Sequence, residues 1–262
     1  MKKTGTILAI TLFALTGCGG NKPSTDDLIT VDVTASYPKK ELILQDFMDV
    51  EYIPLETNDE FLCQGIVQDI GKDIIAVKNR VNDGDIFIFD RTGKAIRKIN
   101  RKGRSREEYA NISKIILDED NSEMFVNDYF ASKIVVYDLG GEFKRSFSHK
   151  DSTGYHDIYS FDRGNLICHA SDWAADRQVF MIVSKQDGRV TEEISIPFEK
   201  KLSIMLRLRD EASGVTYTAG PDMYPIIPYF DSRILVEPSS DTVYSYLPDH
   251  NMIPFITRTP SI

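Results

Sequence analysis

Basic residues are concentrated in one short stretch of an otherwise acidic chain. Residues 91–106 hold eight lysines and arginines and no acid, whereas the 262-residue chain has a formal net charge of −9. Arginine and lysine bind carboxylates and sulfates, and arginine does so through a planar fork of donors. We therefore predict a rim that binds a uronate, sulfate or carboxylate, formed by Arg101, Lys102, Arg104 and Arg106. The alternative is a solvated hairpin edge and loop, where lysines discourage edge pairing.

Four more residues are candidates for the same ligand site. Tyr109 follows the basic stretch and offers a ring on which a sugar could stack. Asn127 and Asp128 could join it, although such residues in a turn more often bond their own backbone. Trp173 is the only tryptophan and lies in a polar stretch. In an exposed loop it would be a carbohydrate platform, and against a blade it would belong to the core.

No catalytic or transition-metal motif stands out. The sequence has no G-x-S-x-G elbow, no H-E-x-x-H pattern and no Cys-x-x-Cys pair. Cys63 and Cys168 lie in apolar, strand-like runs, which favours two buried free thiols over a disulfide. The histidines are scattered along the chain, at His149, His156, His169 and His250. We therefore assign no catalytic residue and no metal ligand from motifs.

The first 18 residues have the order of a bacterial lipoprotein signal. Lys2 and Lys3 precede an apolar run over 7–15, and residues 15–18 (LTGC) match a lipobox. The apolar run is far shorter than the ~20 residues of a membrane-spanning helix. We predict lipid on Cys18, and hence a cell-envelope protein held at the outer membrane on its periplasmic or surface face. The alternative is a secretory signal with a chance cysteine.

A strand–turn–strand segment occurs twice in the chain. Residues 86–99 read IFIFDRTGKAIRKI, and residues 134–147, 48 positions later, read IVVYDLGGEFKRSF. Related segments occupy 181–194 and 243–256. A period of this length is typical of a β-propeller. The runs IIAV, IFIF and FMIV are apolar at consecutive positions, as expected for strands packed between neighbouring blades rather than exposed on one face of a sandwich.

These patterns divide the chain into three parts. We predict a signal peptide over 1–17, a flexible tether over 18–27 and an all-β domain of four-stranded blades over 28–262. Strands are expected at 28–33 and 50–55. The first repeat is expected over 65–100 and the second over 112–148. Residues 200–212, within a long connection, fit either a short strand or a helix.

Several segments resemble six-bladed β-propeller lipoproteins of Bacteroides-type bacteria, which are similar to NHL-repeat propellers. They are ETND at 56–59, FDRTGKAIRKINRKG at 89–103, and the stretches 107–126 and 133–147. The resemblance covers about residues 50–262. It implies a six-bladed ring of which about four blades are present, so we expect the chain to be incomplete at its C-terminus. The family's Gly-x-Gly-Pro-x-Glu-Tyr loop keeps only its first glycine and its Glu-Tyr end, at 103–109.

The resemblance implies a non-catalytic receptor or scaffold that binds a ligand at the mouth of the ring. The predicted partners are an acidic glycan or another envelope protein, and the membrane through the anchor at Cys18. The net acidic charge argues against nucleic acid. No cofactor is expected for this function.

The alternative is an enzyme, because some six-bladed propellers are metal-dependent lactonases or lyases. Oxygen ligands from several blades would suit Ca²⁺. The candidates for such ligands are Asn127, Asp128, Asp157 and Asp162. Carboxylates that converge on the axis of the ring would favour the enzyme, and a basic and aromatic mouth would favour binding.

Overall fold

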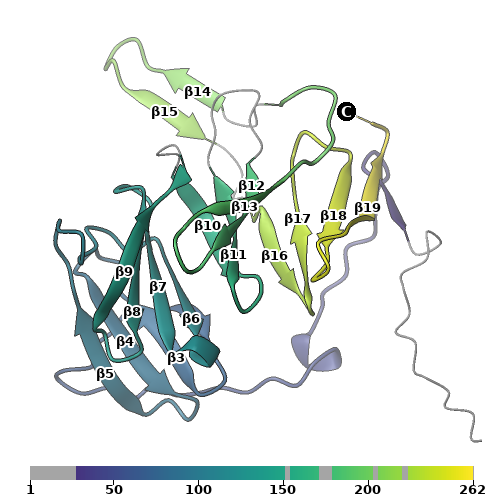
Figure 1. Ribbon diagram of the computed structural model, residues 1–262. Helices are drawn as coiled ribbons and strands as arrows, with labels where there is room; N and C mark the ends of the chain where they lie inside the picture. Colours follow the sequence, from purple (N-terminus) through teal and green to yellow (C-terminus); the bar gives the residue numbers. More distant parts are fainter. Residues whose placement is uncertain (1–27, 151–153, 171–178, 203–205, 220–223, 262) are drawn as a thin grey trace, which may run out of the picture.

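The computed structural model describes residues 28–150, 154–170, 179–202, 206–219 and 224–261 (Figure 1). Almost all of its regular structure is β. The first blade consists of β2 (Ile66–Ile70), β3 (Ile74–Lys78), β4 (Asp85–Asp90) and β5 (Ala95–Asn100). The second consists of β6 (Lys114–Asp118), β7 (Glu123–Asp128), β8 (Lys133–Asp138) and β9 (Phe143–Ser148). Both sheets are antiparallel and follow chain order, as the 48-residue repeat predicts.

The third and fourth blades have the same order. The third consists of β10 (Tyr155–Ser160), β11 (Asn165–Ala170), β12 (Phe180–Ser184) and β13 (Val190–Ile194). The fourth consists of β16 (Ile226–Tyr229), β17 (Ser232–Leu235), β18 (Thr242–Tyr246) and β19 (Met252–Thr259), and β1 (Ile29–Asp32) adds to β19 in parallel. Strands β2, β6 and β10 lie side by side, as the first strands of neighbouring blades do in a ring.

The connections differ in part from the expectations. Residues 50–55 contain no strand; Ile53 and Leu55 instead pack beside the first blade. Between the third and fourth blades, β14 (Leu206–Arg209) and β15 (Thr216–Ala219) form a separate hairpin, so residues 206–209 of the ambiguous stretch form a strand (Figure 1). Two short 3-10 turns complete the described elements, η2 (Leu44–Asp46) and η3 (Glu119–Asn121).

The core lies between the blades. One buried cluster joins the first two blades through residues such as Ile88 and Val126, a second joins the next pair, and a third joins the last pair. The central strands β4 and β8 are buried at four consecutive positions each. The prediction that these apolar runs are covered on both faces is therefore confirmed. Cys63 and Cys168 are both free thiols; Cys168 is fully buried and Cys63 half-buried.

A glycine in the last turn of each of the first three blades contacts the chain that precedes that blade. Gly93, Gly141 and Gly188 have φ of +86°, +89° and +74°. A Cβ on Gly93 would lie 2.1 Å from the backbone oxygen of Pro54, and one on Gly188 would lie 2.2 Å from the Phe147 ring. These positions therefore need glycine both for the left-handed backbone and for the close approach.

The fourth blade has His250 at the corresponding turn, also with a positive φ, of 66°. Its Nδ1 lies 2.7 Å from Glu192 Oε2 on β13, and Tyr246 Oη donates to Glu192 Oε1 over 2.7 Å. In the fourth blade, polar contacts of Tyr246 and His250 with Glu192 thus take the place of the close approach that glycine makes in the first three blades.

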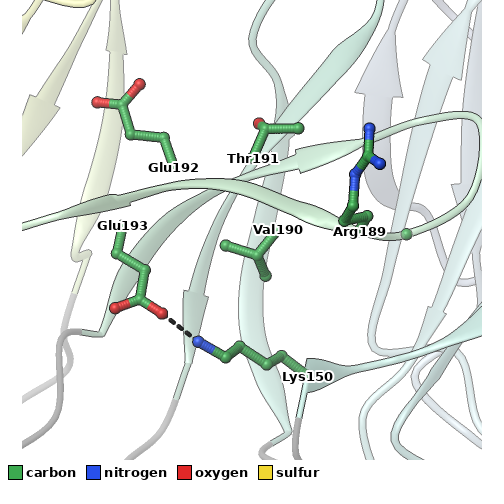
Figure 2. Close-up of a pocket in the computed structure, with 7 residues that line it drawn as sticks. Lys150, Arg189, Val190, Thr191, Glu192 and Glu193 are labelled. Atoms are coloured by element: carbon green, nitrogen blue, oxygen red, sulfur yellow. Dashed lines mark hydrogen bonds and ion pairs between the residues drawn. The ribbon is translucent and has the colours of Figure 1, made fainter.

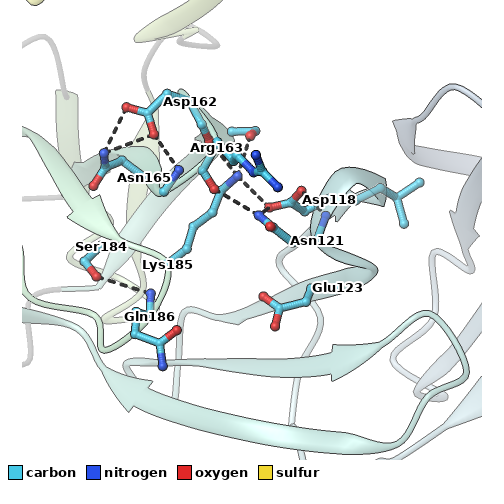
Figure 3. A network of polar contacts seen from close by, with 12 residues as sticks. Asp118, Asn121, Glu123, Asp162, Arg163, Asn165, Ser184, Lys185 and Gln186 are labelled. Atoms are coloured by element: carbon cyan, nitrogen blue, oxygen red, sulfur yellow. Dashed lines mark hydrogen bonds and ion pairs between the residues drawn. The ribbon is translucent and has the colours of Figure 1, made fainter.

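A buried lysine joins the second and third blades (Figure 3). Lys185 Nζ donates to Asp118 Oδ2 over 2.7 Å, to Ser160 Oγ over 2.9 Å and to the Asp162 carbonyl over 2.8 Å. All three donor positions of the ammonium are therefore satisfied. This network holds the join between the blades and leaves Lys185 no capacity for a ligand.

Candidate ligand site on the inner strands

Polar side chains interrupt the first strands of the first and third blades, in each case at a bulge. Gln68 is the extra residue of a bulge in β2, and Asp69 follows it. His156 is the extra residue of a bulge in β10, and Asp157 follows it. A bulge changes the direction of the neighbouring side chains. Each of the two blades therefore contributes a carboxylate from the residue that follows its bulge.

Lys114 lies near both carboxylates, and a second cation, Arg233, lies near Tyr159. Lys114 begins β6, between β2 and β10, and its Nζ lies 4.8 Å from the centroid of the Tyr159 ring. Arg233 lies on β17, where Nη1 donates to the Ser232 carbonyl over 2.9 Å and Nη2 to the Ser160 carbonyl over 2.5 Å. Among the described residues, no acid forms an ion pair with either side chain.

Burial and charge shape the protonation of this group. Burial raises the pKa of Asp157 to about 6, although Lys114 and a hydrogen bond with Tyr159 oppose the rise. Burial, and then the charge of Asp157, raise the pKa of Tyr159 to about 12. Burial also raises the pKa of Asp69. It lowers the pKa of Arg233. Each group is thus partly withdrawn from water, where its interactions with a ligand are stronger.

Three buried polar atoms in the described part of the chain have no hydrogen-bond partner, namely Gln68 Oε1, Arg233 Nε and His169 Nδ1. Buried polar atoms are nearly always satisfied in folded proteins, and an exception points to a bound water or ligand. Gln68 and Arg233 belong to the strands just described. We call Gln68, Asp69, Lys114, Asp157, Tyr159 and Arg233 the inner cluster.

The structure gives three predicted site residues internal partners. Tyr109 is fully buried; its hydroxyl donates to the Gly84 carbonyl over 2.7 Å, so its ring offers no face to a sugar. Asn127 is also buried, between the Tyr155 carbonyl and His149 Nε2. Asp128 Oδ2 accepts the backbone N–H groups of Ala110 and Asn111. These side chains hold loops in place.

The basic loop lies apart from the inner cluster in its contacts. Arg101 pairs with Glu142 at 2.8 Å, and Lys102 Nζ donates to the Asn82 carbonyl. Arg104 and Arg106 are exposed and have no ion-pair partner among the described residues. Only these two arginines of the predicted rim keep their guanidinium groups available. Trp173 and Cys18 lie outside the described residues.

The candidate metal ligands do not come together. Asp162 holds Asn165 in the turn after β10, and Asp157 lies on the inner strand. Within the described ranges, no three His, Cys, Asp or Glu side chains are arranged to hold a metal ion. In the same ranges, no helix is long and apolar enough to cross a membrane.

Sequence reasoning missed most of the inner cluster and considered Asp157 only as a metal ligand. The available signal was a polar pair inside an apolar strand, QD at 68–69 and HD at 156–157. Lys114 and Arg233 carry no such signal, because single basic residues at strand ends are common on solvated surfaces.

A groove lies elsewhere, along the outer strand β13 (Figure 2). It measures about 450 Å³ and is lined by Lys150 and residues 188–193. Lys150 and Glu193 pair across it, and Glu192 is bound by Tyr246 and His250. Because Lys150, Glu192 and Glu193 are paired within the molecule and the groove is open to solvent, we place the candidate site on the inner strands instead.

Comparison with known proteins agrees with this architecture. Residues 20–262 match the DUF5128 family, described as a 6-bladed beta-propeller. The structure of a Bacteroides fragilis NCTC 9343 protein described as exported is similar over 89% of this chain and 60% of its own, with 13% identity and a TM-score of 0.58. A Bacteroides vulgatus member of the DUF4221 family is similar over 77% of this chain and 60% of its own, with 10% identity and a TM-score of 0.45.

None of the curated proteins compared with the chain matches it. The chain spans about 60% of the length of the Bacteroides fragilis protein. At 13% identity that likeness shows the fold alone, while the family match covers nearly the whole chain. The four-stranded blades, their order and this match lead to one assignment: the chain belongs to the DUF5128 family of six-bladed β-propellers.

Proposed function

We propose that this chain is the propeller of a lipid-anchored binding protein of the bacterial cell envelope, and that its ligand is an acidic glycan. One observation carries the proposal: Lys114 and Arg233 are half-buried cations that form no direct ion pair among the described residues, and both lie near Tyr159. A cation that has lost part of its hydration gains most from a charge-assisted hydrogen bond to an anion.

The envelope location is supported by the lipobox at 15–18 and by the exported relative from Bacteroides fragilis. Glycan binding is supported by the mixture of donors and acceptors in the inner cluster. Proteins generally bind sugars through convergent polar groups on a concave surface. Arg104 and Arg106 could extend the site toward a longer anionic chain.

The test is isothermal titration calorimetry of the purified chain with tri-galacturonate, and with maltotriose as the uncharged comparison. Lys114→Met and Arg233→Met should each weaken tri-galacturonate binding about tenfold or more, because each removes one charge-assisted contact. The Arg104→Ala/Arg106→Ala double variant is the matched control and should change it by less than about threefold. Loss of binding in the control alone would place the site on the basic loop, and no binding by the wild-type chain would reject the proposal.

A second candidate function is a metal-dependent lactonase or lyase. The two inner carboxylates, Asp69 and Asp157, favour it, because they come from two blades as axial metal ligands would. A rise in melting temperature with Ca²⁺ that disappears in Asp157→Asn would support this candidate. No rise at millimolar Ca²⁺ would exclude a calcium site at these residues.

A further inference from the structure

The hairpin of β14 and β15 projects away from the blades (Figure 1). Every residue from 206 to 217 is exposed, and none belongs to a buried apolar cluster of the described chain. A two-stranded hairpin is at best marginally stable in water unless another strand or surface covers its apolar face. We propose that the apolar face of this hairpin lies on a bilayer that contains anionic lipid.

The register of the hairpin sorts its side chains by face. Leu208 pairs with Tyr217, so these two side chains share one face, and Leu206 lies on the same face two residues earlier. All three side chains are more than half exposed. Arg207 and Arg209 lie on the opposite face. An apolar face backed by a basic face is typical of elements that lie in the membrane interface.

The charge around β14 is complementary to an anionic surface. Residues 200–209 hold four basic residues and no acid, in a chain with a formal net charge of −9. Lys201 is paired with Glu237, whereas Lys200 and Arg209 are exposed and form no ion pair among the described residues. An acidic molecule with one basic arm turns that arm toward a negatively charged surface.

The turn of the hairpin determines how it lies on the bilayer. Asp210 and Glu211 occupy this turn, and carboxylates at the tip oppose insertion of the hairpin end-on into lipid. Asp210 is held in the turn, where it accepts from the backbone N–H of Ala212 over 2.9 Å and from Ser213 Oγ over 2.8 Å. The hairpin therefore lies flat, with its apolar face toward the acyl chains and its arginines at the level of the phosphate groups.

A second copy of the chain fits this face less well than a bilayer does. A standard protein interface buries ~800 Å² on each partner, and a few apolar side chains supply far less. A bilayer needs no matched surface, and the lipid predicted at Cys18 would hold the hairpin close to one. Two weak membrane signals together give stable attachment where a single signal is marginal. This contact goes beyond the proposed function, and its test uses neither the glycan nor the lipid anchor.

The first test places an NBD fluorophore on either face of the hairpin in the processed chain, residues 18–262. Cys18 and Cys63 are replaced by serine, and Cys168 is fully buried. Leu208→Cys puts the label on the apolar face, and Thr216→Cys is the matched control on the basic face. With vesicles of phosphatidylethanolamine and phosphatidylglycerol, the label at 208 should brighten and shift to the blue, because it leaves water, and the label at 216 should change much less.

The second test is flotation of the same Cys18→Ser chain, without label, on these vesicles and on phosphatidylcholine vesicles. Leu206→Ser/Leu208→Ser should abolish flotation. Arg207→Gln/Arg209→Gln should weaken binding to the anionic vesicles about tenfold or more and leave binding to phosphatidylcholine unchanged. The matched control is Phe130→Ser, which removes an apolar side chain that is 77% exposed outside the hairpin and should change nothing.

Three results would overturn the proposal. They are equal changes of the two labels, unchanged flotation of the leucine double variant, and equal binding of the wild-type hairpin to anionic and phosphatidylcholine vesicles. A blue shift of the label at 208 that needs no vesicles and grows with protein concentration would assign the face to a second copy, and would overturn it as well. Glycan binding, measured without vesicles, is independent of each of these outcomes.

Discussion

Charged residues of this propeller fall into two groups that differ in their hydrogen-bond partners. Glu123 illustrates the structural group: Arg145 donates to both of its oxygens, at 2.7 and 2.6 Å, and Lys144 pairs with it at 2.5 Å. Lys185 belongs to the same group. Lys114 and Arg233 form the other group, because neither makes a direct ion pair among the described residues, although Asp69 and Asp157 lie near Lys114 and Asp231 near Arg233. Partners rather than burial alone therefore separate residues that hold the fold from residues available to a ligand.

The Glu123 ion pair makes stability depend on pH. The hydrogen bond from Arg145 is the main reason that the pKa of Glu123 falls from 4.5 to about 2 in the folded chain. Because the folded-state pKa is depressed, this stabilisation is present above pH 4.5 and is lost as the pH falls toward 2. We expect a loss on the order of 2 kcal/mol in the free energy of unfolding across that interval, measured by urea denaturation.

Glu123→Gln should remove that part of the pH dependence and lower stability at pH 7. Glu142→Gln is the control, since Glu142 is 77% exposed in its pair with Arg101 and should contribute little. An unchanged acid slope in Glu123→Gln would show that the pair does not stabilise the folded state.

At the scale of elements, the turn between the last two strands of a blade contacts the outer strand of the preceding blade. Gly141 approaches Ile99 on β5, and Arg97 Nη1 donates to the Gly140 carbonyl over 2.8 Å. One blade later, Arg145 Nη2 donates to the Lys185 carbonyl over 2.7 Å. At the same place in the repeat, an arginine on the outer strand of one blade thus donates to a backbone carbonyl in the last turn of the next blade.

Gly93→Ala should therefore destabilise the chain through two effects. The side chain would strain a residue at φ +86° and would collide with the backbone oxygen of Pro54. We expect a loss of about 2 kcal/mol or more, which corresponds to a fall in melting temperature of about 4–8 °C. Differential scanning calorimetry measures it.

Gly214→Ala is the control for this substitution. Gly214 has a φ of +70° but no atom within 4 Å of a built Cβ, so its replacement adds backbone strain without a collision. Its effect should be clearly smaller. Equal effects at both positions would mean that the contact with Pro54 contributes nothing.

The sequence was sufficient for the repeated elements and insufficient for the site. The regular spacing of Gly93, Gly141 and Gly188 indicates a turn in which residues other than glycine are strained. Apolar runs such as 86–89 indicate strands that are covered on both faces. Lys114 and Arg233 could not be found in this way, because what distinguishes them is the absence of a partner that only the fold reveals. Tyr109 was misleading for the opposite reason: an aromatic residue after a basic loop is buried as readily as it is exposed.

At the scale of the whole molecule, each blade contacts its neighbours in chain order. The apolar clusters, the turn glycines and the Lys185 network all join consecutive blades. The inner cluster depends on this order, since its residues come from four blades. A ligand held there would connect blades that are otherwise joined only in pairs.

The location of the molecule is testable through Cys18. In a bacterial host the wild-type chain should fractionate with membranes, and Cys18→Ser should abolish the attachment of lipid at residue 18. Mass spectrometry of the N-terminal peptide should show the acyl mass only in the wild type. A wild-type chain without an acyl mass at residue 18 would contradict anchoring at this residue.

The contact of residues 54–56 with the first blade has a consequence for how the chain folds as it is synthesised. Glu56 N donates to the Gly93 carbonyl over 2.8 Å, and Glu56 Oε2 accepts from Ala95 N over 3.0 Å, so this short segment takes the place that an outer strand takes for later blades. The first blade can consequently pack against residues 54–56 before any other blade has been synthesised. Each later blade can then pack against a blade that has already formed, so assembly can proceed from the N-terminus one blade at a time.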